Sequence, residues 1–348
     1  IYALYKAGVD LTTVRQQFVR ETQDYGDPHL LAERLEGKPI DYNFVIIHLT
    51  PDLYLNHLEP DKYHIGHLFW ETDRLPNGWA WYCNRLDEIW TGSETNKEAI
   101  IRSGVKVPVL VFPEPIQEVK PSDFEPYIIP NHKGFMFYSI FEWTERKNPK
   151  TLLNAYWQEF EGESEVSLLL KTYRDNYTMQ MHQKIKSEIQ ELKMTSDVRK
   201  FPRILYSYEL LTQEEMFKLH TTGDCLVSAS HGEGWGRPQA EAMLMEKPII
   251  STNYGGIHEY LNDSVAYALP YELVPVTEDP DRVYYTPDQN WAEVDFNELK
   301  AKMRFVYENR DKRETVGQAA RKFIQTNFNP EKVGGAMKKR LLKIEEGL

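Results

Sequence analysis

Short runs of apolar residues alternate along the chain with longer segments whose apolar residues recur at helical spacing. This alternation is typical of βαβ units, which build parallel sheets. In the first third of the chain, four buried strands are expected, and a helix capped near Ser93 follows the third of them. These strands are expected at residues 44–48, 65–70, 87–91 and 107–112.

A proline-bearing stretch separates this part from a second alternation. Pro113 and Pro115 are followed by a polar segment with three more prolines before residue 133, which indicates a linker. Residues 268–289 are rich in proline and tyrosine, so we expect a loop insertion there. Beyond the linker, strands are expected at residues 134–141, 166–172, 224–229 and 248–252. Helices are expected at residues 149–160, 177–193, 212–220, 238–246, 297–307 and 330–344.

The length of 348 residues suggests two domains, at roughly 100–200 residues per domain. The predicted fold class is α/β, with a Rossmann-like parallel sheet in each domain. Residues 1–10 have the pattern of a helix end followed by a strand, so we expect the first strand of the fold to precede this sequence. The expected divisions are an N-terminal domain at 1–115, a linker at 116–133, a C-terminal domain at 134–327, and a last helix at about 328–348 that joins the first domain.

Charge and cysteine content exclude several classes of function. The formal net charge of −12 argues against general nucleic-acid binding, which needs a basic surface. Cys83 and Cys225 are far apart and belong to no CxxC pair, so neither a zinc site nor a disulfide framework is supported, and a reducing, cytoplasmic location is expected. No apolar run is long enough to span a bilayer, and no signal peptide is visible.

The end of the chain is basic. Residues 301–348 contain twelve Lys and Arg against six Asp and Glu, a local balance of +6. Such a stretch attracts an anionic substrate or the inner face of a membrane, so peripheral membrane contact is one interpretation. A solvated helix face is the other, and the composition leaves both open.

The segment SASHGEGWGRPQAEAM, residues 228–243, carries the most informative pattern. A predicted strand ends in a loop with glycines at 232, 234 and 236, and Pro238 opens the next helix. Closely spaced glycines let backbone amides approach a ligand, and the helix N-terminus adds unpaired N–H groups and a positive dipole end. Together they predict a site for phosphate or for sugar hydroxyls.

Two carboxylates lie in this segment, eight positions apart. Glu233 is in the loop, and Glu241 is expected in the first turn of the helix. A carboxylate accepts two hydrogen bonds and therefore suits a vicinal diol, so one glutamate would hold a donor sugar and the other a ribose. The alternative is that Glu241 only complements the helix dipole and that the glycines only form a turn.

A second candidate site lies in FEWTERKNPK, residues 141–150. Asn148 is a favourable N-cap and Pro149 a favourable first helical residue, so Arg146 and Lys147 stand at the positive end of a helix. Cations are mildly unfavourable there, and a diphosphate would compensate them. Alternatively, both side chains extend into solvent or pair with neighbouring glutamates.

The segment HGEGWGRPQAEAM, followed by KPIISTNYGG, resembles the donor-site signature of retaining GT-B glycosyltransferases of family 4, the glycosyl transferases group 1. The likeness covers nearly the whole chain and includes the stretches FWETDRLP, DEIWTGS and QNWAEVD and the closing helix. It implies two Rossmann-like, doubly wound domains that face each other across a cleft. The N-terminal domain would hold the acceptor and the C-terminal domain the nucleotide-sugar donor.

The resemblance also implies residue roles. Glu233 would contact the donor sugar and Lys147 a phosphate. In many relatives the partner arginine lies several residues upstream, where this chain has Phe141 and Glu142, so Arg146 would take its place. The implied donor-binding residues are Glu241 on the ribose, Gly234, Trp235 and Gly236 on the sugar and diphosphate, and Arg237.

The implied reaction moves a hexose-type sugar from a nucleotide diphosphate sugar to an acceptor hydroxyl with retention, as in hexosyltransferases of class EC 2.4. Lys147, Arg146 and the loop amides would stabilise the leaving diphosphate without a metal and without a cofactor beyond the donor. A UDP- or GDP-linked donor is implied, with a carbohydrate, lipid-linked or other hydroxyl acceptor. The Asp-x-Asp sequence at Asp279-Pro280-Asp281 is weak evidence for a divalent ion.

The acceptor side has no decisive motif. Relatives often place a histidine at the end of the strand expected at 65–70, where Trp70 and Glu71 fall in this chain. Glu71 or Asp73 would therefore face the acceptor. Further candidates, each of a type that is more often structural, are His48, His57, His64 and His67.

Other functions fit parts of the pattern. A nucleotide-sugar epimerase or a phosphorylase of the same fold would share the donor cleft, and a catalytically silent module would only bind the nucleotide sugar. A nicotinamide dehydrogenase fits poorly, because the glycines run GxGxG rather than GxGxxG and no acidic residue ends a following strand.

Overall fold

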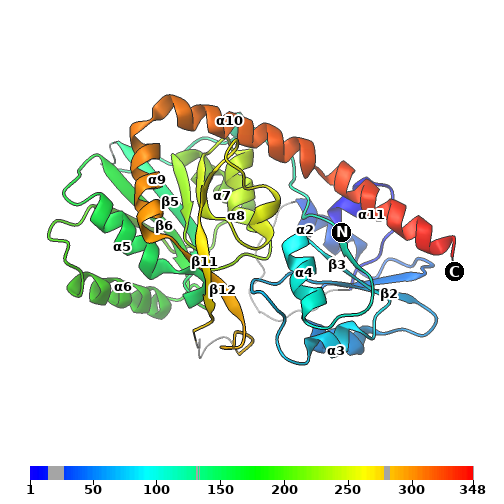
Figure 1. Ribbon diagram of the computed structural model, residues 1–348. Helices are drawn as coiled ribbons and strands as arrows, with labels where there is room; N and C mark the ends of the chain where they lie inside the picture. The colour runs from blue at the N-terminus through cyan, green and yellow to red at the C-terminus, as the bar shows by residue number, and fades with distance from the viewer. Residues whose placement is uncertain (15–26, 131, 133, 278–282, 348) are drawn as a thin grey trace.

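The computed structural model describes residues 1–14, 27–130, 132, 134–277 and 283–347, and it contains two α/β halves side by side (Figure 1). The first half is built on a parallel sheet in the order β1-β2-β3-β4. Its strands are β1 (Phe44–Ile47), β2 (Tyr63–His67), β3 (Glu88–Thr91) and β4 (Val109–Val111). Its helices are α1 (Tyr2–Lys6), α2 (Asp27–Leu35), α3 (Trp79–Cys83) and α4 (Glu94–Arg102).

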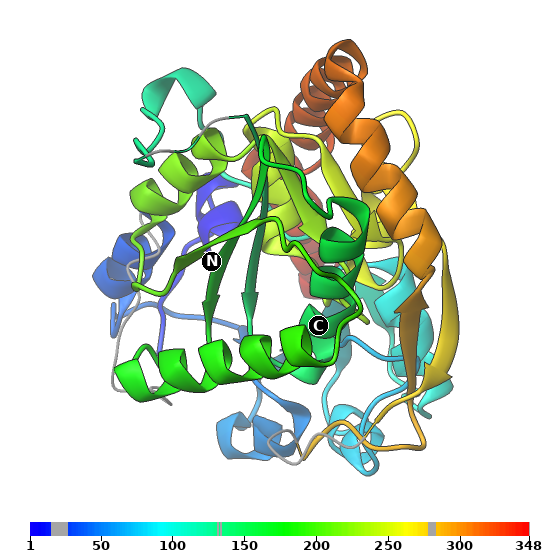
Figure 2. The same ribbon diagram turned by 90° about the vertical axis from the view of Figure 1, so that its left-hand side faces the viewer.

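The second half is built on a six-stranded parallel sheet in the order β10-β9-β8-β5-β6-β7. The strand order reverses between β5 and β8, which is the doubly wound Rossmann arrangement. The strands are β5 (Phe135–Glu142), β6 (Val166–Tyr173), β7 (Arg203–Ser207), β8 (Cys225–Ser228), β9 (Ile249–Thr252) and β10 (Tyr267–Leu269). The helices are α5 (Pro149–Glu159), α6 (Met179–Met194), α7 (Gln213–Thr222), α8 (Arg237–Leu244), α9 (Phe296–Glu308) and α10 (Arg310–Asn327). Figure 2 shows α6 and α5 lying across one face of this sheet.

The last helix, α11 (Pro330–Glu345), leaves the second half and packs on the first (Figure 1). Its apolar face, with Val333 and Met337, joins a core cluster that contains Ile65 and Trp90 of the first sheet. Arg340 adds a hydrogen bond of 3.0 Å to a carboxylate oxygen of Glu88. The structure thus ties the end of the chain to the first half, while the domain divisions at 115 and 134 stay predictions.

Several arginines in the basic end of the chain form contacts within the fold. Arg304 donates to Glu159 at 2.7 Å, and Arg321 donates to the carbonyl oxygens of Leu244 and Val119. These contacts favour a structural interpretation for the arginines of α9 and α10. None of the described helices combines the length and the apolar character needed to cross a bilayer.

The predicted strands of both halves are confirmed to within a few residues, but the loop predicted at 268–289 is wrong in part. It contains the end of β10 and the strand β11 (Tyr271–Pro275), which pairs antiparallel with β12 (Asn290–Val294). This hairpin is held by backbone pairing, and β11 is mostly exposed, so no alternation of buried and exposed positions marks it in the sequence.

Three further features of the structure differ from the sequence prediction. The chain after α1 forms no strand among residues 1–14, and only Thr13 makes an isolated bridge, to Glu36. The strand β7 was not predicted. The helix α10 was also missed, because two of its three fully buried residues, Gly317 and Ala320, are small; a Cβ at Gly317 would overlap the carbonyl oxygen of Glu246.

Lys171 is a buried cation within β6, with 3% of its surface exposed. Its ammonium lies 5.1 Å from the ring centre of Tyr177 and 5.9 Å from that of Tyr173. Burial lowers the pKa of Lys171 from 10.5 to about 8. The folded protein therefore binds fewer protons than the unfolded chain between these two pH values, and its stability rises with pH across that window.

Lys171→Met is expected to stabilise the protein at pH 7 by about 2 kcal/mol, because the cost of the buried charge disappears while the apolar stem is kept. The variant should also lose the rise in unfolding free energy between about pH 8 and 10.5. Urea unfolding as a function of pH measures both effects. Lys184→Met, at an exposed position of α6, is the control and should change neither. A destabilised Lys171→Met would contradict the prediction.

Candidate active site

The candidate site lies at the switch point of the second sheet. The loops after β5 and β8 both leave the carboxyl ends of their strands there, which is where doubly wound sheets bind ligands. The loop after β8 contains Glu233 and leads into α8, with Gly236 as N-cap at φ +85° and Pro238 in the first turn. The predicted strand, glycine loop and helix tip are therefore present.

Glu241 lies deeper in the helix than expected. Because α8 begins at Arg237, Glu241 is one full turn further on, and the first turn contains no acidic residue. Its carboxylate receives a hydrogen bond of 3.1 Å from Arg237 and lies 3.7 Å from Nε2 of His220. Burial acts to raise the pKa of Glu241, but His220 and Arg237 outweigh it and hold the pKa below its ordinary value.

His220 is fully buried and had not been singled out in the sequence. Its Nδ1 lies 2.9 Å from the hydroxyl of Tyr138, so it connects that hydroxyl with the Glu241 carboxylate. The sequence offered no signal for this role beyond the position of His220 at the end of a predicted helix. His220 thus lies between Tyr138, to which it is hydrogen-bonded, and the Glu241 carboxylate, which is within ion-pair distance of its Nε2.

The loop after β5 brings two cations to Glu233. Lys147 donates to both carboxylate oxygens of Glu233, at 2.6 and 2.7 Å, and Arg146 lies 3.5 Å from one of them. Arg146 also donates to the carbonyl oxygen of Gly232 at 2.6 Å. The two cations thus turn to the glycine loop, and the alternative of side chains in solvent does not hold. Asn148 caps α5 as expected, accepting a hydrogen bond from the amide of Thr151.

The buried position of Glu233 shapes its acidity. Burial by itself would raise the pKa of the carboxyl, but the charges of Lys147 and Arg146 overcome it, and the pKa is lowered. Burial lowers the pKa of Lys147, opposed by the nearby Glu233 carboxylate. The site therefore holds a desolvated ion pair between Lys147 and Glu233. An anion with more charge than one carboxylate could take the place of Glu233 beside Lys147.

The first half closes directly over this loop. A Cβ at Gly232 would overlap the carbonyl oxygen of Glu71, and a Cβ at Gly234 would lie 3.0 Å from Cβ of Phe69. Trp235 is turned the other way, with its ring 5.3 Å from those of Tyr260 and Phe328 in the core. The glycines thus permit a close contact between the two halves, and only the backbone of Trp235 is left to face a ligand.

Glu71, expected on the acceptor side, lies beside the cations. Its carboxylate is 3.6 Å from Arg146 and accepts a hydrogen bond of 2.9 Å from the hydroxyl of Tyr285. The Tyr285 ring stacks on Trp70 at 5.2 Å. Tyr285 had not been singled out, since its segment was assigned to a loop.

Asp73 joins the two halves instead of facing open space. Its carboxylate accepts hydrogen bonds from the backbone amide of Asn290 at 2.6 Å and from the Asn290 side chain at 3.0 Å. The adjacent Thr72 hydroxyl donates to Gln289 at 3.0 Å. The stretch after β2 is thus hydrogen-bonded to Gln289 and to Asn290, the first residue of β12.

Two of the four candidate histidines meet at the carboxyl ends of β1 and β2. Nδ1 of His48 lies 2.8 Å from Nδ1 of His67, and burial lowers the pKa of His67. The strand β2 ends at His67, so the strand expected at 65–70 ends three residues earlier than predicted, while the acceptor role of Glu71 or Asp73 stays a prediction. Backbone pairing of β2 with β3 stops at His67, so the residues after it form a loop. His64 is engaged locally, accepting from the Glu59 amide at 2.8 Å, and for His57 no contact is described.

Within the part of the chain that the structure describes, no group of three or more His, Cys, Asp or Glu side chains is placed to hold a metal ion. Asp279-Pro280-Asp281 lies outside the described residues.

Residues 132–282, which carry most of the second half, match the family described as glycosyl transferases group 1. No curated protein matches the chain. Among solved structures, the chain is similar to a sucrose-phosphate synthase from Thermosynechococcus elongatus, with a TM-score of 0.65, 14% identity, and coverage of 88% of this chain and 75% of that one.

Two further structures show the same likeness. HepE from Anabaena, solved with UDP and glucose, has a TM-score of 0.62 and 14% identity, covering 87% of this chain and 78% of that one. A glycosyltransferase from Rickettsia africae has a TM-score of 0.61 and 17% identity, covering 90% of this chain and 79% of that one. At these identities the likeness shows the fold, so the predicted GT-B architecture of two Rossmann-like halves is confirmed.

Proposed function

We propose that the protein is a retaining, metal-independent glycosyltransferase that takes a hexose-type sugar from a nucleotide diphosphate sugar. The observation that carries this proposal is the contact of Lys147 and Arg146 with Glu233 at the glycine loop of the second half. The match of this half to group 1 glycosyl transferases supports it. HepE, a structural neighbour, was solved with UDP-glucose, which favours a UDP-linked donor.

In this mechanism the donor replaces an internal ion pair. The diphosphate binds Lys147, Arg146 and the amides at the start of α8, because two phosphates offer these cations more charge than one carboxylate does. Glu233, released from Lys147, accepts hydrogen bonds from hydroxyls of the donor sugar, while Glu241 binds the ribose. The donor thus fills a site whose groups are already in place.

During transfer, the bond between the anomeric carbon and the diphosphate breaks, and the acceptor oxygen bonds to that carbon on the same face. The acceptor proton passes to the leaving phosphate oxygen, so no separate base is required. Negative charge grows on the diphosphate as the bond breaks, and Lys147 and Arg146 stabilise it in a site from which the first half excludes water.

A nucleotide-sugar screen tests the proposal. UDP-, GDP- and ADP-linked hexoses should raise the melting temperature in proportion to occupancy, and one nucleotide should be preferred. With the preferred donor, NMR of the product should show the anomeric configuration of the donor, and turnover should persist in EDTA. Failure of every nucleotide sugar to bind would overturn the proposal, and an inverted product or loss of turnover in EDTA would overturn the mechanism.

A further inference from the structure

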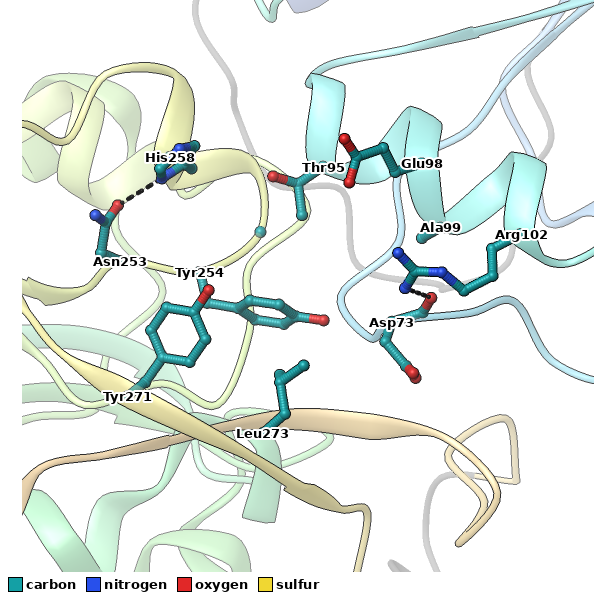
Figure 3. Close-up of a pocket in the computed structure, with 11 residues that line it drawn as sticks. Asp73, Thr95, Glu98, Ala99, Arg102, Asn253, Tyr254, His258, Tyr271 and Leu273 are labelled. Carbon is teal, nitrogen blue, oxygen red and sulfur yellow. Dashed lines mark hydrogen bonds between the residues drawn. The ribbon is translucent and has the colours of Figure 1, made fainter.

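A hollow of about 230 Å³ lies between the two halves, next to the candidate active site but not lined by Glu233 (Figure 3). One wall is α4 of the first half, which contributes Glu98 and Arg102. The other wall is the second half, which contributes Tyr254 and Tyr271. Figure 3 shows the Tyr254 ring reaching across the hollow toward α4. Of its lining residues, Asp73 was expected on the acceptor side from the sequence.

The walls are held in place by hydrogen bonds that the lining residues make with each other and with the second half. Arg102 donates to the backbone carbonyl of Asp73 at 3.1 Å, and Asp73 is bound to Asn290 of the second half. On the opposite wall, the side chains of Asn253 and His258 lie 3.1 Å apart. The cavity is therefore preformed, and a ligand would not have to order its walls on binding.

Several polar groups that line the hollow have no hydrogen-bond or ion-pair partner among the described residues, although the rings of Tyr254 and Tyr271 contact each other at 5.2 Å. Within the described part of the protein, the hydroxyls of Tyr254, Tyr271 and Thr95 and the carboxylate of Glu98 make no hydrogen bond or ion pair. Glu98 and Arg102 are one helical turn apart, yet they form no ion pair with each other in the described structure. Donors and acceptors thus face the cavity from both halves, which suits a ligand that carries several hydroxyls.

The charge and the apolar surface of the hollow narrow the chemical class of its ligand further. Glu98 and Asp73 both line the hollow and place negative charge near Arg102, so a phosphate is disfavoured there. At the rim, Tyr271 and Leu273 occupy alternate positions of β11 and are 38% and 51% exposed. Side chains two apart on a strand share a face, so they offer one apolar surface beside the polar groups. This combination fits a sugar ring, which has hydroxyls at its edge and C–H groups on its face.

The pocket is joined to the donor loop through the backbone. Gly255 lines the hollow and forms a parallel bridge with Glu233, and the amide of Gly256 donates to the Glu233 carbonyl at 2.7 Å. We propose that this pocket binds a neutral pyranose unit of the acceptor, held by Glu98, Arg102 and the two tyrosines. This inference rests on the transferase function proposed above, since it places the acceptor sugar beside the donor.

Binding of simple neutral glycosides tests the inference directly. The probes are the methyl α- and β-glycosides of glucose, galactose, mannose and N-acetylglucosamine, followed by saturation-transfer NMR and titration on the full chain. At least one should bind, and Glu98→Ala or Tyr271→Ala should each raise its Kd by about tenfold or more, as expected for a lost charged hydrogen bond or ring contact. The two residues lie in different halves, so one substitution is not expected to disturb the fold around the other. Melting curves of both variants show whether each is folded.

Matched controls come from neighbouring or similar positions. Lys97→Ala changes the residue beside Glu98 on α4, and Tyr127→Ala removes a tyrosine that is 40% exposed in the linker region. Both should leave the Kd unchanged. If no probe binds, if only inorganic phosphate binds, or if the pocket variants bind as tightly as the controls, the inference is wrong. A separate titration of the wild type with nucleotide sugars tells whether the proposed function fails as well.

Discussion

Lys147→Met should lower kcat by about 10²–10³-fold, because it removes a fixed cation aimed at the phosphate on which charge develops. The side chain lies 2.6 Å from Glu233 and is largely buried, so no solvent cation replaces it. Steady-state kinetics with the preferred nucleotide sugar measure the effect. Lys150→Met, at an exposed lysine on α5 that pairs with Glu145, is the matched control and should keep nearly full activity.

The same substitution also affects stability. It leaves the Glu233 carboxylate buried with Arg146, at 3.5 Å, as its remaining cationic neighbour among the described residues, so a loss of about 3 kcal/mol in unfolding free energy is expected. Adding Glu233→Gln removes the stranded charge and should restore much of that stability while the enzyme stays inactive. Full turnover in a folded Lys147→Met protein would remove this lysine from the mechanism.

Gly232→Ala is the second substitution with a large expected effect. The new Cβ would overlap the carbonyl oxygen of Glu71, so the first half must move away from the glycine loop. A displacement of about 1 Å at a reacting centre costs on the order of 10²-fold in rate, and a loss of this size is expected in kcat/KM. Because the clash is with backbone of the other half, neither sheet needs to change.

A helical glycine serves as the comparison for Gly232→Ala. Gly335 in α11 has no atom within 4 Å of an added Cβ, so Gly335→Ala should keep full activity and gain about 0.5–1 kcal/mol in stability. Small-angle scattering of the Gly232→Ala protein should show the halves further apart. Wild-type kinetics in this variant would mean that the halves need not touch at this loop during turnover.

The positions of most strands of the two parallel sheets could be predicted from the chain, since apolar runs of strand length alternate with helical periods in both halves. The glycine loop and its helix could also be predicted, because Gly236 and Pro238 act through local backbone geometry. The hairpin of β11 and β12 could not, because its stability comes from pairing across a long insertion and not from its own periodicity. The helix α10 was not predicted either, because its buried face combines Ile324 with the small residues Gly317 and Ala320 and so has a weak apolar period.

The sequence by itself determined the α/β architecture, the glycine loop, and the identity of Glu233, Arg146 and Lys147 as candidates, because each depends on residues close together in the chain. Only the tertiary structure decided which groups meet them. Glu71 and Tyr285 stand 214 positions apart and converge on Arg146, and His220 reaches Glu241 from another helix. Such contacts follow from how two sheets and their loops pack against each other. The local periodicity of the sequence carries no information about which residues meet across such long separations in the chain.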